Sequence, residues 1–219
     1  MKTYGQYCAL ARGLDLVGDR WTLLIVRELL SLGKCRYSDL QRGLPGIATN
    51  LLAQRLREME DADLVRRIRL PRPVNAVVVA LTERGEALHD VVREFVKWGA
   101  PLMAVPSPED AFRPHWLMLP LRGLCRDNNP SDARVVVRVG TLYDGCDIIA
   151  HSGIIEVNPS RFDGDPDATV TGNPGALVAL FTGQLPIEAA PGAGVSIDGA
   201  TAAVRRVIGG MSTASTRGA

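Results

Sequence analysis

A turn rich in glycine and proline divides residues 36–69 into two segments with helical periodicity, and this arrangement limits the folds open to the chain. The turn is Gly43-Leu44-Pro45-Gly46, whose residue types end one helix before another begins. After the turn, Leu52, Leu56 and Met59 recur at helical spacing, which predicts an amphipathic helix. A basic, strand-forming stretch follows. Helix, turn, helix and basic strand, in this order, predict a winged helix-turn-helix.

The helix after the turn, expected from Thr49 to Ala62, also has a polar face. Asn50, Gln54 and Arg57 follow the same spacing on the side opposite the apolar residues. Amide and guanidinium groups can hydrogen-bond base edges or phosphates in a major groove, so the helix is equipped to read DNA. An ordinary surface helix has a polar face too, and the residues that follow must separate the two interpretations.

A basic β-hairpin is expected directly after this helix. Residues 64–70 and 74–81 are rich in strand formers, and Pro71-Arg72-Pro73 lies between them. The basic residues of this wing are Arg66, Arg67, Arg69 and Arg72. Cations on a wing can contact flanking phosphates or a minor groove. Their alternative role is to keep an edge strand soluble.

Further helices are expected on both sides of this region. The first covers residues 8–17, the second begins with Asp19 as its N-cap and ends at Gly33, and a short scaffold helix covers residues 36–44. A last helix is expected over residues 82–103. The apolar stripe expected to face inward from it consists of Leu88, Val91, Val92, Phe95 and Trp98. Because its own domain has nothing left to cover so long a stripe, we predict a homodimer.

The distribution of charge favours a nucleic-acid partner, although the net charge does not. The chain has 219 residues, enough for two domains, and a net charge of +1. Residues 1–104 contain 16 basic and 12 acidic residues, a balance of +4, whereas the remainder contains 9 and 12, a balance of −3. The positive charge lies where the reading helix is expected.

Targeting, disulfide and metal signals are weak. The first residues lack the apolar core of a signal peptide and no apolar run could cross a bilayer, so we expect a cytoplasmic protein without a membrane partner. The four separated cysteines are expected to be thiols. Asp163, Asp165 and Asp167 alternate like the start of a calcium loop, but the required glycine and closing glutamate are missing. We expect no metal and no other cofactor.

Residues 8 to about 103 resemble the HxlR family of bacterial winged-helix regulators through several motifs in the same order. The matching stretches are Cys8, Gly18–Ile25, Arg36–Leu40, Pro45–Ile47, Leu52–Glu58, Leu64–Arg67 and Leu81–Gly85. The resemblance implies a homodimer built with the first and last helices of the domain, a palindromic operator and, in many members, a redox or electrophile response through the N-terminal cysteine. Two departures affect helix boundaries: Ala48-Thr49 replaces a serine-containing pair, which moves the expected capping hydroxyl to Thr49, and Asp63 replaces a glycine.

We expect DNA contacts from the scaffold helix, the reading helix and the wing. The candidates are Arg36, Ser38, Thr49, Asn50, Gln54, Arg55, Arg57, Arg67, Arg69 and Arg72. Cys8 is a candidate redox sensor, because a helix N-terminus favours the reactive thiolate. The alternative for Cys8 is a buried, inert thiol.

A second domain is expected after a proline-containing linker at residues 105–112. The first domain then covers residues 1–104, the second 113–210, and residues 211–219 form a flexible tail. Short helices and strands alternate in the second domain, which makes the whole chain α+β. The stretches Asp167–Pro174, Leu180–Leu185 and Gly194–Gly199 resemble sterol-carrier-protein-like domains. That resemblance implies a mixed sheet, covering helices and an apolar tunnel.

Apolar residues of the second domain are candidates for lining such a tunnel. They are Trp116, Leu117, Leu121, Leu177, Leu180 and Phe181. A packed core uses the same residue types, so the pattern alone does not separate a hydrophobic ligand site from a core. No nucleophile, base and orienting group occur with catalytic spacing, and no glycine loop for phosphate is present, so we predict no enzyme.

The leading hypothesis is a homodimeric, DNA-binding transcription regulator whose second domain binds a hydrophobic small molecule or extends the dimer. The alternative is a lipid-binding protein whose helix-turn-helix mediates protein interaction. Salt dependence separates the two, because binding dominated by phosphate contacts weakens steeply as salt rises.

Overall fold

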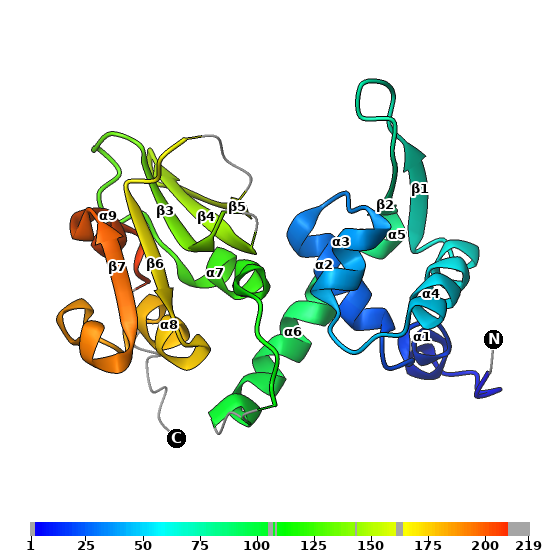
Figure 1. Ribbon diagram of the computed structural model, residues 1–219. Coiled ribbons are helices and arrows are strands. Elements are labelled where there is room, and N and C mark those ends of the chain that lie inside the picture. Colours follow the sequence, from blue (N-terminus) through cyan, green and yellow to red (C-terminus); the bar gives the residue numbers. More distant parts are fainter. Residues whose placement is uncertain (1–2, 105–106, 108, 143, 161–163, 210–219) are drawn as a thin grey trace, which may run out of the picture. The chain divides into compact units, whose positions relative to one another are not determined.

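The chain divides into two units, residues 1–102 and 103–219, each with its own buried apolar residues (Figure 1). The computed structural model describes residues 3–104, 107, 109–142, 144–160 and 164–209. Several predicted features lie outside these residues: part of the linker, Asp163 of the rejected calcium loop, and the tail. Helices and strands occur in both units, which confirms the α+β class.

The first unit contains the predicted helix-turn-helix and hairpin. Its elements are α1 (Ala9–Val17), α2 (Thr22–Leu32), α3 (Tyr37–Gly43), α4 (Thr49–Asp61), β1 (Val65–Arg69), β2 (Val77–Leu81), α5 (Glu83–Glu86) and α6 (His89–Gly99), and the 3-10 helix η1 (Ala100–Ala104) spans the boundary at residue 102. β1 and β2 pair antiparallel, from Val65 opposite Leu81 to Arg69 opposite Val77. This hairpin, the wing, extends beyond the helices of its unit (Figure 1).

A buried carboxylate fixes the place where the helix-turn-helix turns. Glu28 of α2 is fully buried, and Arg27 Nη2 donates to Glu28 Oε1 at 2.7 Å and to the Gly43 carbonyl oxygen at 3.3 Å. A Cβ at position 43 would lie 1.9 Å from Glu28 Oε2, so only glycine fits there. α2 therefore holds the last residue of α3, where the turn to α4 begins.

The expected caps of two helices were wrong. α2 begins at Thr22 with Trp21 as its N-cap, and the Asp19 carboxylate accepts the Trp21 N–H and pairs with Arg55 instead of capping the helix. Thr49 is the first residue of α4, not its cap; the extended residue Ala48 takes the cap position and has no side-chain acceptor. In both cases the side chain that was expected to cap a helix contacts a residue of another helix instead: Asp19 pairs with Arg55, and Thr49 accepts from Gln41.

The last helix of the first unit is interrupted, and most of its apolar stripe faces solvent. α5, α6 and η1 replace the single predicted helix. Val92 is buried and α6 contacts α2, but Val91, Phe95 and Trp98 are 47%, 58% and 70% exposed. The expectation that these three side chains point inward was wrong, because α2 covers only one side of α6.

The second unit is a mixed sheet with short helices. Its elements are η2 (Pro114–Leu117), α7 (Met118–Leu124), β3 (Val135–Thr141), β4 (Asp144–His151), β5 (Ile154–Pro159), β6 (Ala168–Gly172), α8 (Pro174–Phe181), η3 (Ile187–Ala189), η4 (Pro191–Ala193), β7 (Val195–Gly199) and α9 (Thr201–Val207). The strand order is β5-β4-β3-β6-β7. β3 and β6 are parallel, and the other neighbouring strands are antiparallel. Short helices and strands therefore alternate in this unit, as predicted.

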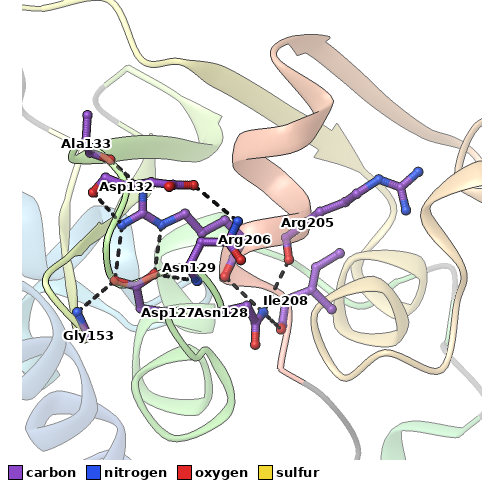
Figure 2. Close-up of polar contacts among 9 residues, drawn as sticks. All are labelled: Asp127, Asn128, Asn129, Asp132, Ala133, Gly153, Arg205, Arg206 and Ile208. Atoms are coloured by element: carbon purple, nitrogen blue, oxygen red, sulfur yellow. Dashed lines mark hydrogen bonds and ion pairs between the residues drawn. The ribbon is translucent and has the colours of Figure 1, made fainter.

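A buried ion pair attaches α9 to the loop before β3 (Figure 2). Arg206 Nε donates to Asp127 Oδ1 at 2.7 Å and Nη2 donates to Oδ2 at 3.2 Å, and the two side chains are almost completely buried. The Gly153 N–H donates to Asp127 Oδ2 at 2.9 Å. The Asn128 amide donates to the carbonyl oxygens of Arg206 and Ile208, at 3.0 and 2.9 Å, which satisfies acceptors that the end of α9 leaves open.

The Asp127 carboxylate should make the stability of the second unit sensitive to acid. Hydrogen bonds from Arg206, and from backbone N–H groups, lower the pKa of Asp127 to about 2. A carboxylate with a lowered pKa stabilises the fold above its unfolded pKa of about 3.9 and loses this contribution as the pH falls through the folded value. Asp127→Asn should therefore weaken the second unit at neutral pH and flatten the acid dependence of its unfolding below about pH 4. Hydrogen–deuterium exchange of α9 peptides across this pH range measures both effects, and wild-type behaviour of the variant would contradict the assignment.

Candidate nucleic-acid interface

Helix α4 has one buried apolar face and one exposed polar face, as predicted. Leu52, Leu56 and Met59 are at most 3% exposed. Asn50, Gln54 and Arg57 are exposed on the other side. The helix therefore exposes two amide side chains and a guanidinium, and the buried residues on its opposite face fix its orientation.

Hydrogen bonds between α3 and the first turn of α4 orient the two helices. The Tyr37 hydroxyl donates to the Thr49 carbonyl oxygen at 2.5 Å, and the Gln41 amide donates to Thr49 Oγ1 at 2.8 Å. Gly46 has φ +84°, a conformation that glycine adopts without strain, in the turn between the helices. The Thr49 hydroxyl is thus an acceptor within the protein but keeps its own proton for an outside group.

The start of α3 carries two further candidates. Arg36 and Ser38 are both exposed. The Arg36 N–H donates to Asp39 Oδ2 at 3.0 Å, so the backbone is held while the guanidinium stays in solvent. Both side chains can reach an anion outside the protein.

The wing carries exposed guanidinium groups from its strand to its tip. Arg67 Nε lies 3.2 Å from Glu60 Oε2 of α4, and its side chain remains 48% exposed. Arg69 is exposed near the end of β1, and Arg72 is exposed in the tip, where the Arg72–Pro73 peptide is cis. The Leu70 N–H donates to the Ala76 carbonyl oxygen at 2.8 Å and continues the pairing toward the tip. The wing therefore presents a series of cations along one edge of the unit.

Arg55 differs from the other candidates on α4. Its guanidinium pairs with Asp19 Oδ2 at 2.9 Å and Glu58 Oε2 at 2.5 Å, and the side chain is only 20% exposed. The structure therefore does not bring the Arg55 charge to the face that presents Asn50, Gln54 and Arg57. Sequence reasoning missed Asp19 and Glu58 as partners, although the i, i+3 spacing of Arg55 and Glu58 is a signal for such a pair.

The four cysteines are free thiols, and only Cys8 is exposed. Cys8 is the N-cap of α1, as its position in the sequence predicted. Burial raises the pKa of the Cys125 thiol to about 12 and raises that of Cys146 as well, which disfavours their thiolates at neutral pH. Any chemistry that needs an accessible cysteine therefore falls to Cys8.

The proposed tunnel residues of the second unit lie mostly in its packed interior. Those at most 6% exposed are Leu117, Leu121, Leu177, Leu180 and Phe181. Trp116 is half-buried and its ring packs edge-on against Phe112 at 6.4 Å. A hollow of about 300 Å³ in this unit, between Gly183 and Ile208, is lined by none of the six. A ligand tunnel among these residues stays a prediction.

In the part of the chain that the structure describes, no three His, Cys, Asp or Glu side chains gather as metal ligands. None of the helices in that part has the length and apolar character needed to traverse a bilayer.

Comparison with known proteins places the first unit in a family. Residues 16–105 match the family described as HxlR-like helix-turn-helix. The HTH-type transcriptional regulator YvaP of Bacillus subtilis is 33% identical over 87 residues, which are 40% of this chain and 80% of that protein. YodB, an HTH-type transcriptional regulator of the same organism, is 37% identical over 84 residues, 38% of this chain and 74% of that protein.

Solved structures of YodB include a diamide-treated form and a quinone-bound form. The first is 32% identical, covers 46% of this chain and 99% of that chain, and has a TM-score of 0.37. The second is 33% identical, covers 43% and 98%, and has a TM-score of 0.37. On its sequence matches, the chain belongs to the HxlR-like helix-turn-helix family of DNA-binding transcriptional regulators.

Proposed function

We propose that this regulator binds operator DNA as a homodimer, with the exposed face of α4 in the major groove and the wing beside it. The observation that carries the proposal is the exposed set Asn50, Gln54 and Arg57 on a helix held from behind by buried residues. Amides pair with adenine and guanidinium groups with guanine in a major groove, so this set can discriminate bases.

The remaining candidates are suited to the DNA backbone. Arg36, Ser38 and Thr49 lie at the starts of α3 and α4, where hydroxyl, guanidinium and backbone N–H groups can bind a phosphate. Arg67, Arg69 and Arg72 on the wing can neutralise flanking phosphates. These contacts would set the register of α4 and supply most of the salt-dependent affinity.

Exposed apolar side chains on α1 and α6 support a homodimer. Leu10 is 71%, Phe95 58% and Trp98 70% exposed, and the Phe95 and Trp98 rings lie 5.5 Å apart. Soluble monomers rarely leave a large apolar patch such as the Phe95–Trp98 pair in water, and a second copy of the same unit can cover it. A two-fold dimer would also present two copies of α4 to two half-sites.

Two inputs could modulate the binding. Oxidation or alkylation of Cys8 would act at the start of α1, within the proposed dimer region, and the relative YodB has a quinone-bound structure. A hydrophobic molecule in the second unit is the other input, supported by the sterol-carrier-like motifs of the sequence. Either input shifts operator affinity only as far as it favours one arrangement of the dimer over another.

Substitutions on α4 and on the wing should affect DNA binding in different ways. Arg57→Ala and Gln54→Ala should relax discrimination at single operator positions, each by about 1–3 kcal/mol if the contact is bidentate. Arg72→Ala should weaken binding to every sequence and reduce the slope of log K against log salt by about 0.9. Titrations of operator and mutated operators at several salt concentrations separate the two effects. Unchanged operator preference in Arg57→Ala would show that α4 reads DNA with another face.

The dimer should depend on α6. Replacing Trp98 by Asp should raise the dimer dissociation constant by about 100-fold, because removal of a central interfacial aromatic costs about 2–4 kcal/mol. Ile154→Asp is the matched control, since Ile154 is 53% exposed but lies on β5 of the second unit. Sedimentation equilibrium measures both variants, and a wild-type protein that is monomeric at micromolar concentration would contradict the proposal.

The redox input should depend on Cys8 alone. Diamide or a quinone should change operator binding of the wild-type protein and leave the Cys8→Ser variant unaffected, because the other thiols are buried. Peptide mass spectrometry should locate the modification at Cys8. An equal response of the variant would rule this input out.

A further inference from the structure

The guanidinium of Arg55 is directed at protein groups although Arg55 lies next to the proposed reading face of α4. Nη1 donates to Glu58 Oε2 at 2.5 Å, and Nη2 lies 2.9 Å from Asp19 Oδ2. The third nitrogen, Nε, is buried and has no hydrogen-bond partner among the described residues. All three nitrogens are therefore occupied by the protein or enclosed by it.

Each of the two carboxylates around Arg55 has a second partner. Asp19 Oδ1 accepts the Trp21 N–H at 3.3 Å, at the start of α2. Glu58 Oε1 accepts from the Gln54 amide at 2.9 Å. A continuous set of polar contacts thus runs from the corner between α1 and α2, through Arg55, to a side chain proposed to read a base.

Hollows border α4 on the side of Arg55. A hollow of about 680 Å³ is bordered by Thr3 and Tyr4 of the N-terminal arm, by Leu14 of α1, and by Gln54 and Arg55 of α4. Met59, one of the core residues of α4, lies one helical turn beyond Arg55 and borders a second hollow with it. Beside the hollow, the pair between Arg55 and Asp19 ties α4 to the corner between α1 and α2.

We propose that Arg55 is a positioning residue and makes no contact with DNA: it holds α4 to the α1–α2 corner and, through Glu58, sets the orientation of Gln54. This inference rests on the proposed function, because it takes the exposed face of α4 as the DNA-reading surface. It replaces the expectation that Arg55 contacts DNA. To reach a phosphate, Arg55 would have to leave both carboxylates uncompensated next to a polyanion.

The test compares Arg55→Ala, Asp19→Ala and the double variant in operator titrations over a series of KCl concentrations. Each single variant should weaken binding by roughly 3- to 30-fold with an unchanged salt slope, and the double variant should be about as weak as either single variant. The Asp19 result is decisive, because removal of a negative charge would strengthen binding to DNA if charge repulsion alone were at work. Arg72→Ala is the control that should lower the slope.

Further variants guard against loss of folding. Arg55→Lys keeps the charge but lacks the planar fork that spans two carboxylates, so it should weaken binding with an unchanged slope. The exchange of charges in Asp19→Arg with Arg55→Asp should recover affinity relative to Arg55→Asp alone. Thermal unfolding of each variant confirms that it is folded under the titration conditions.

Two results would overturn the proposal. One is the result expected of a phosphate contact: the slope of log K against log salt falls by about 0.9 in Arg55→Ala, and Asp19→Ala binds DNA at least as tightly as the wild type. The other is full additivity of the two single variants. A wild-type protein without salt-dependent DNA binding would instead contradict the proposed function itself, whatever the variants do.

Discussion

Burial of Leu52, Leu56 and Met59 decides which face of α4 is left in solvent, and the candidate interface depends on that choice. Full burial of one such side chain contributes about 1.5–3 kcal/mol, whereas an exposed ion pair contributes about 0–1 kcal/mol. The apolar face therefore fixes the rotation of α4 about its axis. The hydrogen bonds from α3 to Thr49 and the pair between Arg55 and Asp19 then adjust the helix within limits that the core has set.

The first unit exposes two surfaces of opposite character. α4 and the wing present amides and guanidinium groups, and α1 and α6 present large apolar side chains. Neither surface is covered within a single chain. We propose that DNA binds the surface of α4 and the wing, and that a second copy of the chain covers the apolar side chains of α1 and α6. Cys8 lies at the start of α1, so its chemistry would act on the dimer rather than directly on the groove.

The faces of α4 and the pairing of the wing could be predicted from sequence because each follows from a local period in the residues. Features that depend on tertiary partners could not. Asp19 is a residue type that often caps a helix, but here its carboxylate pairs with Arg55. Arg55 is a residue type that often contacts DNA, but here its guanidinium pairs with the carboxylates of Asp19 and Glu58. The stripe with Phe95 and Trp98 reads as a core, and its exposure follows from how little of α6 the rest of the unit covers. Leu177 and Phe181 would look the same in a core and in a tunnel.

The most direct test of the account is selection of bound sequences from random DNA by the wild-type protein. A dimer that reads DNA through α4 should select two inverted half-sites separated by about one helical turn, 10–10.5 base pairs between centres, or a multiple of it. Enrichment of a single, unpaired site, or binding without any preferred sequence, would contradict a dimer that reads DNA through the exposed face of α4.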